Sequence, residues 1–76
     1  MAPTPDEART MSEIKAEMAR RGLTQQQMAD ATGVTREAYG RYLNGRRSMP
    51  METFFATAAA FELTPAELME RAWPKK

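Results

Sequence analysis

The sequence predicts an all-α fold, in which five short helices form one compact bundle over residues 1–76. Apolar side chains recur at three- and four-residue spacing, as at Met11, Ile14 and Met18, and this spacing places them along one face of a helix. Threonines that can cap a helix precede several of these segments. A chain of 76 residues makes one small domain, and no linker or internal repeat divides it.

The first helix is expected to begin at Thr4 and Pro5, or one turn later, and to end at Gly22. Thr4 can cap it, proline suits the first helical position, and the acidic pair that follows is favoured by the positive end of the helix dipole. Glycine can close the helix at its other end. The charged residues expected to point away from its apolar stripe are Glu13, Lys15, Glu17 and Arg20.

Residues 25–31 and 36–44 are expected to form the second and third helices, joined by a turn at 32–34. Thr24 can cap the second helix, while Gln27 reaches back to the cap backbone. Gly33 can take the left-handed conformation that ends a helix, and Thr35 caps the next helix at once. Two helices joined by a short turn that contains glycine are typical of the DNA-binding helix-turn-helix, which places its second helix in the major groove.

The rotation of about 100° per residue divides residues 36–44 into two unlike faces. One face is polar, and the opposite face carries Tyr39, Tyr42 and Leu43, which we expect in the core. Either tyrosine hydroxyl could still reach a phosphate from the rim. The split fits a helix that packs on one side and reads DNA on the other, although ordinary amphipathic helices also show it.

The fourth and fifth helices follow a turn that is rich in hydrogen-bond donors. Ser48 is expected to cap a fourth helix opened by Pro50, and a fifth helix should span residues 65–72 behind the cap Thr64. The apolar residues expected to face inward from these two helices are Phe54, Phe55, Ala58, Phe61, Leu68 and Met69.

The run from Ile14 to Leu68 resembles the lambda-repressor-like (Cro/repressor-type, Xre-type) helix-turn-helix family. The resemblance implies a bundle of five helices and a sequence-specific regulator of transcription that binds double-stranded DNA, of the kind found in phage-type or small bacterial repressors. The residues that carry it are Gly22-Leu23-Thr24-Gln25, Met28-Ala29, Gly33-Val34-Thr35, Asn44-Gly45, Pro50, Leu63-Thr64 and Glu67-Leu68.

One departure from the family pattern concerns two positions beneath the motif. Many members carry an arginine where this chain has Met18 and a glutamate where it has Leu43, and the two side chains pair. Replacing a buried ion pair by packed apolar side chains is often neutral or stabilising. The joint change therefore agrees with the fold that the resemblance implies.

Composition argues against catalysis and against bound metals. The chain has no histidine and no cysteine, so it lacks the usual acid–base group, a thiol nucleophile, a disulfide framework and the usual zinc ligands. No phosphate-binding glycine-rich loop occurs. We therefore expect no enzymatic activity and no cofactor. Without a membrane-spanning run or a signal peptide, we expect a cytoplasmic protein.

The distribution of charge, rather than the net charge of +1, points to a nucleic acid. Residues 1–35 hold four basic and five acidic side chains, and residues 48–76 hold three and four. Residues 36–47 hold four arginines against Glu37 alone, a local charge of +3. Each contact with a phosphate is a local event, so this clustering matters more than the total.

Roles on DNA can be assigned residue by residue. Arg36 and Arg41 suit bidentate contact with guanine. The resemblance implies that Gln25 reaches a phosphate or an adenine edge and braces the first residue of the reading helix. Glu37 could accept from cytosine or pair with Arg41, and Gly40 indicates either close approach to DNA or a tolerated surface glycine. The predicted base contacts are Arg36, Glu37, Gly40, Arg41 and Gln25, and the predicted phosphate contacts are Thr24, Thr35, Asn44, Arg46 and Arg47.

Two alternatives stay open at the level of the sequence. The same bundle could serve as a protein-interaction module, such as an antitoxin or an accessory regulatory subunit, with the arginines against an acidic protein surface. If DNA is the partner, we expect at most a weak homodimer that DNA promotes. Met69 and Trp73 are the candidate dimer contacts, although Trp73 could instead fold back on its own core.

Overall fold

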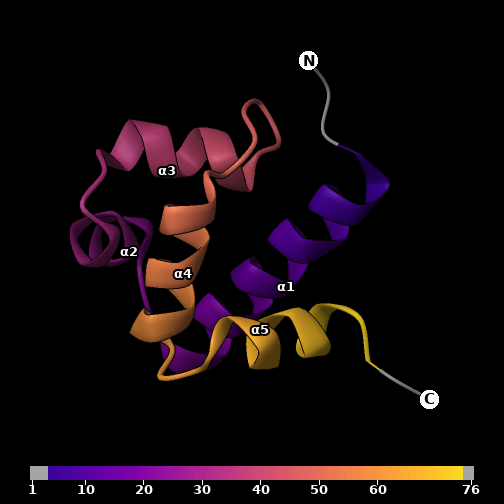
Figure 1. The fold of residues 1–76 in the computed structure, drawn as a ribbon. Coiled ribbons are helices and arrows are strands. Elements are labelled where there is room, and N and C mark those ends of the chain that lie inside the picture. Colours follow the sequence, from indigo (N-terminus) through magenta and orange to yellow (C-terminus); the bar gives the residue numbers. More distant parts are fainter. Residues whose placement is uncertain (1–3, 75–76) are drawn as a thin grey trace.

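The computed structural model describes residues 4–74, and within them the chain forms five α-helices and no strand. Figure 1 shows α3 across one end of the bundle and α5 across the other, with α4 running between these two levels. No helix in this range is long and apolar enough to cross a membrane. The predicted all-α bundle is confirmed. The bounds are α1 Pro5–Arg21, α2 Gln25–Thr32, α3 Arg36–Leu43, α4 Met51–Ala60 and α5 Pro65–Ala72.

Threonine caps set the start of four helices where the sequence predicts them. Thr4, Thr24 and Thr64 each form a reciprocal capping box with the residue three positions on, and the Thr35 hydroxyl accepts from the Ala38 N–H at 3.1 Å. Each cap satisfies backbone donors that the first helical turn leaves unpaired. The starts of α1, α2, α3 and α5 therefore follow from local chemistry alone.

The start of α4 differs from the prediction. Pro50 is the N-cap and not the first helical residue, because its ψ of 152° is extended, and no side chain among residues 4–74 caps this helix. Ser48 is therefore not the cap, since it lies two residues before the position from which a side chain reaches the first turn. Hydrogen bonding to Ser48 is instead the main cause of the lowered pKa of Glu7 on α1.

The core lies where the five helices meet. Ile14 and Met28 are fully buried there, and the predicted stripe of Met11, Ile14 and Met18 on α1 is confirmed. Met18 and Leu43, the two positions that depart from the family pattern, both lie in this apolar cluster. The remaining largest fully buried side chains are Tyr39, Phe61, Leu68 and Thr57.

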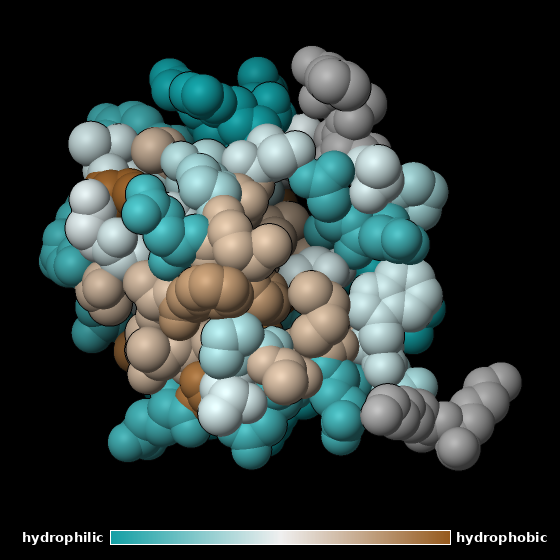
Figure 2. Space-filling view, viewed as in Figure 1, coloured by the Kyte–Doolittle hydropathy of each residue, from teal (hydrophilic) through white to brown (hydrophobic). Residues whose placement is uncertain are grey.

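Two apolar side chains expected in the core are exposed. Phe55 on α4 is 49% exposed and Met69 on α5 is 42% exposed. Each directly follows a buried residue, Phe54 or Leu68, and neighbouring helical residues differ in direction by about 100°, so both cannot face inward. Figure 2 shows the apolar surface that gathers over α4.

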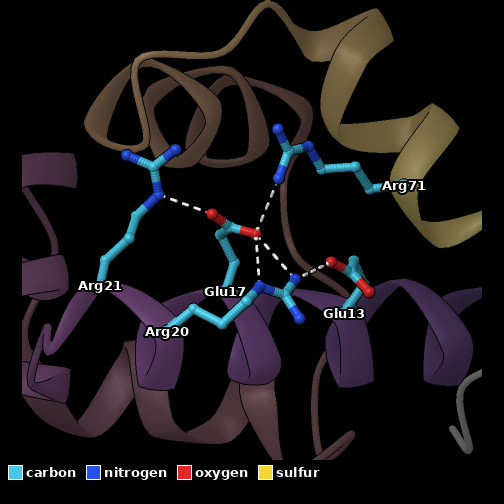
Figure 3. Close-up of polar contacts among 5 residues, drawn as sticks. All are labelled: Glu13, Glu17, Arg20, Arg21 and Arg71. Atoms are coloured by element: carbon cyan, nitrogen blue, oxygen red, sulfur yellow. Dashed lines mark hydrogen bonds and ion pairs between the residues drawn. The ribbon is translucent and has the colours of Figure 1, made fainter.

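Glu17 is the largest departure from the sequence prediction, because this carboxylate is buried and does not point away from the core. The residue is only 3% exposed. Its Oε2 accepts from Arg21 Nε at 2.6 Å, while its Oε1 accepts from Arg20 Nη2 at 2.7 Å and from Arg71 Nη1 at 3.1 Å (Figure 3). Arg20 also pairs with Glu13. One carboxylate thus fastens α5 to α1.

These arginines change the acidity of the buried carboxyl. Hydrogen bonds from Arg21 and then from Arg20 lower the pKa of Glu17 from 4.5 to about 2, against the desolvation that would raise it. The charge is therefore compensated and hydrogen-bonded, as a buried carboxylate requires. Glu17 remains ionised at neutral pH and holds the two helices together.

Candidate DNA interface

The turn between α2 and α3 has the geometry that the motif requires. Gly33 ends α2 in the left-handed conformation with a φ of 76°, and the Val34 N–H donates to the Ala29 carbonyl at 3.1 Å. Thr35 then caps α3 immediately. The chain changes direction within three residues, and α3 packs against α2.

The inner face of α3 is fixed by its two tyrosines. Tyr39 is fully buried, and its hydroxyl hydrogen-bonds the Thr57 hydroxyl of α4 at 2.8 Å. Tyr42 meets the Tyr39 ring edge to face with 6.4 Å between ring centroids. Both are core residues, as predicted, and the Tyr39 hydroxyl is engaged with Thr57 and is not at the rim. This packing sets which residues of α3 face solvent.

The outer face of α3 carries most of the predicted base contacts. Arg36, Glu37 and Arg41 are exposed, while Gly40 between them is buried. Every ion pair among residues 4–74 involves Glu13 or Glu17, so the pair between Glu37 and Arg41, one of the two roles that the sequence left open for Glu37, does not form. The hydrophilic surface over α3 is visible in Figure 2. Neither arginine of this face has a carboxylate partner within the described range.

The turn after α3 extends the basic surface. Gly45 is left-handed, with a φ of 74°, and the N–H groups of Arg46 and Arg47 donate to the Arg41 carbonyl at 2.9 and 3.3 Å. The backbone of the pair is therefore held against the end of α3. Asn44, Arg46 and Arg47 are all exposed. The structure thus brings the four arginines of residues 36–47 onto one helix and the turn that follows it.

Thr24 and Thr35 stand at the two helix starts next to this surface. Their hydroxyl oxygens accept from Gln27 N–H and Ala38 N–H, each at 3.1 Å. A hydroxyl that accepts in a cap keeps its own hydrogen for donation. Both residues are exposed and could donate to a phosphate oxygen without loss of the cap.

Gln25 is placed differently from a free surface side chain. Its Nε2 donates to the Arg36 carbonyl at 3.0 Å, so the brace on the first residue of α3 that the resemblance implied is present. The same carboxamide lies against Gly40, where a Cβ would meet Nε2 at 2.7 Å. The buried Gly40 is therefore not the tolerated surface glycine that the sequence left open. Its contact with Gln25 could not be read from helix periodicity, since it depends on how α2 and α3 cross.

An apolar groove of about 380 Å³ was not predicted from the sequence. It lies between α1, α4 and α5, with Asp6 and Glu7 among its polar lining. Trp73 is 40% exposed and also lies under the Arg9 guanidinium, 4.2 Å from the ring centroid. The main apolar side chains that line the groove are Met11, Met49, Met51, Phe54, Met69 and Trp73.

Comparisons with known proteins agree with this geometry. The sequence profile of the helix-turn-helix family matches residues 14–68. A crystal structure of the clp gene regulator ClgR from Corynebacterium glutamicum superposes with a TM-score of 0.79 at 21% identity, over 95% of this chain and 76% of that chain. A second crystal structure of ClgR from C. glutamicum gives 0.79 at 17% identity, over 92% and 91%. No curated protein matches the sequence.

Proposed function

Because this chain belongs to the helix-turn-helix family and is a DNA-binding regulator of transcription, we propose that α3 enters the major groove and that the protein acts as a repressor. We propose a binding role without catalysis, exercised in the cytoplasm. Phage-type and small bacterial repressors are the class that the resemblance suggests.

One observation carries the proposal about α3. Its exposed face and the following turn hold four arginines without a carboxylate partner in the described range, while the opposite face is locked into the core by Tyr39. Arginine suits both phosphates and the guanine edge. The positive charge of this surface is complementary to the phosphates of a DNA duplex. Because the opposite face of α3 packs in the core, the exposed arginines can bind DNA without a change in the fold.

The proposed roles follow the positions along α3. Arg36 and Arg41 read base edges, with Glu37, Gly40 and Gln25 beside them. Thr24, Thr35, Asn44 and the pair Arg46 and Arg47 hold the phosphates on either side. Phosphate contacts set the position of the protein on the duplex, and base contacts set its sequence preference.

A salt series distinguishes DNA binding from the alternative of a protein-interaction module. In fluorescence polarisation with mixed genomic fragments, the logarithm of the association constant should fall linearly with the logarithm of salt concentration, because each neutralised phosphate releases counterions. Binding that does not change with salt, or no binding at low salt, would favour an acidic protein partner for the same arginines.

Arg46→Ala and Arg47→Ala should each weaken binding to all DNA sequences by a similar factor. If each arginine holds one phosphate, the salt slope should also fall by about one unit in each variant. The measurement is polarisation at several salt concentrations, on one preferred site and on random duplex. An unchanged slope in both variants would place this pair away from the DNA.

The apolar groove supports the proposed weak pairing. A single reading helix covers about half a turn of DNA, and helix-turn-helix proteins commonly bind two half-sites one turn apart as dimers. Met69 and Trp73 are both exposed and line the same groove. We therefore propose that this surface gives a weak contact between copies and that DNA promotes it.

Sedimentation with and without DNA tests this assembly. We expect a monomer or weak dimer in free solution, and pairing on a duplex whose half-sites lie about 10 to 10.5 base pairs apart, or a multiple of that. Met69→Glu should abolish pairing and retain binding to one half-site. A tight dimer without DNA, or one-to-one binding to a palindrome with protein in excess, would contradict the proposal.

A further inference from the structure

Gly40 lies in the middle of α3, where glycine is an unfavourable residue for a helix. Its φ lies outside the left-handed region, so the backbone does not require glycine. The space beside it is filled by another residue. A Cβ at this position would lie 2.7 Å from Gln25 Nε2 and 3.4 Å from Gln25 Cδ. The missing side chain is therefore what lets the Gln25 carboxamide lie against α3.

The carboxamide is held in this place by one hydrogen bond. Gln25 Nε2 donates one hydrogen to the Arg36 carbonyl at 3.0 Å, and within residues 4–74 nothing donates to its Oε1. An amide nitrogen has two hydrogens, so one donor and one acceptor stay free on the same planar group. A donor and an acceptor side by side match the N7 and N6 edge of adenine.

We infer that Gly40 is a positioning residue, which fixes the Gln25 carboxamide across α3 as part of the surface that reads a base pair. Gly40 then contributes to sequence preference through Gln25 and not through its own contact with DNA. The inference rests on the proposed reading role of α3. In this view, the preference at one base pair of the DNA site comes from Gln25, a side chain of α2, which fits into the gap left on α3 by the missing side chain of Gly40.

Gly40→Ala separates this role from a structural one. The alanine Cβ should displace the Gln25 carboxamide, which is the far end of a flexible side chain, while alanine favours the helix. The melting temperature should therefore stay the same or rise. Affinity for the preferred site should fall about tenfold, the usual scale for one lost base contact, with lost preference at one base pair.

A double-mutant cycle with Gln25→Ala tests the coupling. Gln25→Ala alone should lose preference at the same base pair, and Gly40→Ala added to it should change affinity less than twofold, because no carboxamide remains to displace. Gln26→Ala is the matched control, since Gln26 is the exposed neighbour whose amide donates to Asp30 at 2.8 Å. It should retain the affinity and the preference of the wild type.

The outcomes distinguish the inference from the proposed function. Gly40→Ala could reduce affinity equally in the wild type and in the Gln25→Ala variant. This result would mean that the alanine methyl group contacts DNA directly, which would overturn the inference and leave DNA reading by α3 intact. An unaffected Gly40→Ala or Gln25→Ala protein would also overturn it. Failure of the wild type to prefer any sequence would instead refute the reading role. If Gly40→Ala does not fold, Gln25→Leu serves as the test. Leucine removes the donor and the acceptor of the carboxamide, so this variant must lose the same base-pair preference as Gln25→Ala.

Discussion

Glu17→Gln is expected to lower the free energy of unfolding by about 2 kcal/mol at neutral pH. The shift of the Glu17 pKa from 4.5 to about 2 corresponds to about 3 kcal/mol at 1.36 kcal/mol per pKa unit. The expected loss is smaller because Arg20 and Arg71 are about half exposed and regain hydration when the carboxylate is removed. In a domain of this size the melting temperature should fall by roughly 10 °C, which thermal unfolding measures.

The pH dependence identifies the carboxylate as the cause. The pKa of Glu17 is lowered in the folded chain, so its contribution is complete above about pH 4.5 and disappears as the pH falls toward about 2. The difference in melting temperature between the wild type and Glu17→Gln should therefore narrow over that interval. A difference that is constant with pH would show that lost packing is responsible.

Glu13→Gln supplies the matched control. Glu13 lies on the same helix and, among residues 4–74, pairs with Arg20 alone, and its side chain is more exposed than that of Glu17. An ion pair near the surface contributes at most about 1 kcal/mol, so the loss should be well below that of Glu17→Gln. An equal loss in the free energy of unfolding for the two variants would show that the link between α1 and α5 through Glu17 has no special role in stability.

Arg36→Ala and Arg41→Ala are each expected to weaken binding to the preferred site by roughly 1–3 kcal/mol, the range for a lost bidentate base contact. Each variant should also lose preference at one base pair. Both side chains are exposed and lack carboxylate partners within the described residues, so the fold should not change.

Arg46→Ala is the matched comparison for these two variants, since it removes the same side chain from the adjacent turn. Polarisation on the preferred duplex and on random duplex gives the two affinities for each variant. Arg36→Ala and Arg41→Ala should lose more on the preferred duplex, whereas Arg46→Ala should lose equally on both. Equal losses for all three would assign Arg36 and Arg41 to phosphates.

The starts of most helices could be predicted because their signals act over short distances. Thr24 and Thr64 cap a helix through the N–H three residues on, and Gly33 closes α2 at one position. Such interactions depend on neighbouring residues only. The outward and inward faces of α3 followed from helix rotation for the same reason. The contacts of its outward face with DNA remain predictions.

The features that were missed depend on residues far apart in the chain. Glu17 follows Ile14 by three residues and so shares its face, but the partner that joins it to α5 is Arg71, 54 positions later. A carboxylate without that partner would be costly to bury, and for this reason the sequence predicts a surface position for the charged Glu17 side chain. The contact between Gly40 and the Gln25 carboxamide was missed for the same reason, because Gln25 belongs to another helix.

Selection of bound sequences from random duplex DNA tests most directly the claim that α3 reads base pairs. The wild type should enrich one short motif, and the double variant Arg36→Ala, Arg41→Ala should lose the preference at two base pairs of that motif while it still binds DNA through the phosphates. Enrichment of no motif by the wild type, or of an unchanged motif by the double variant, would contradict the account.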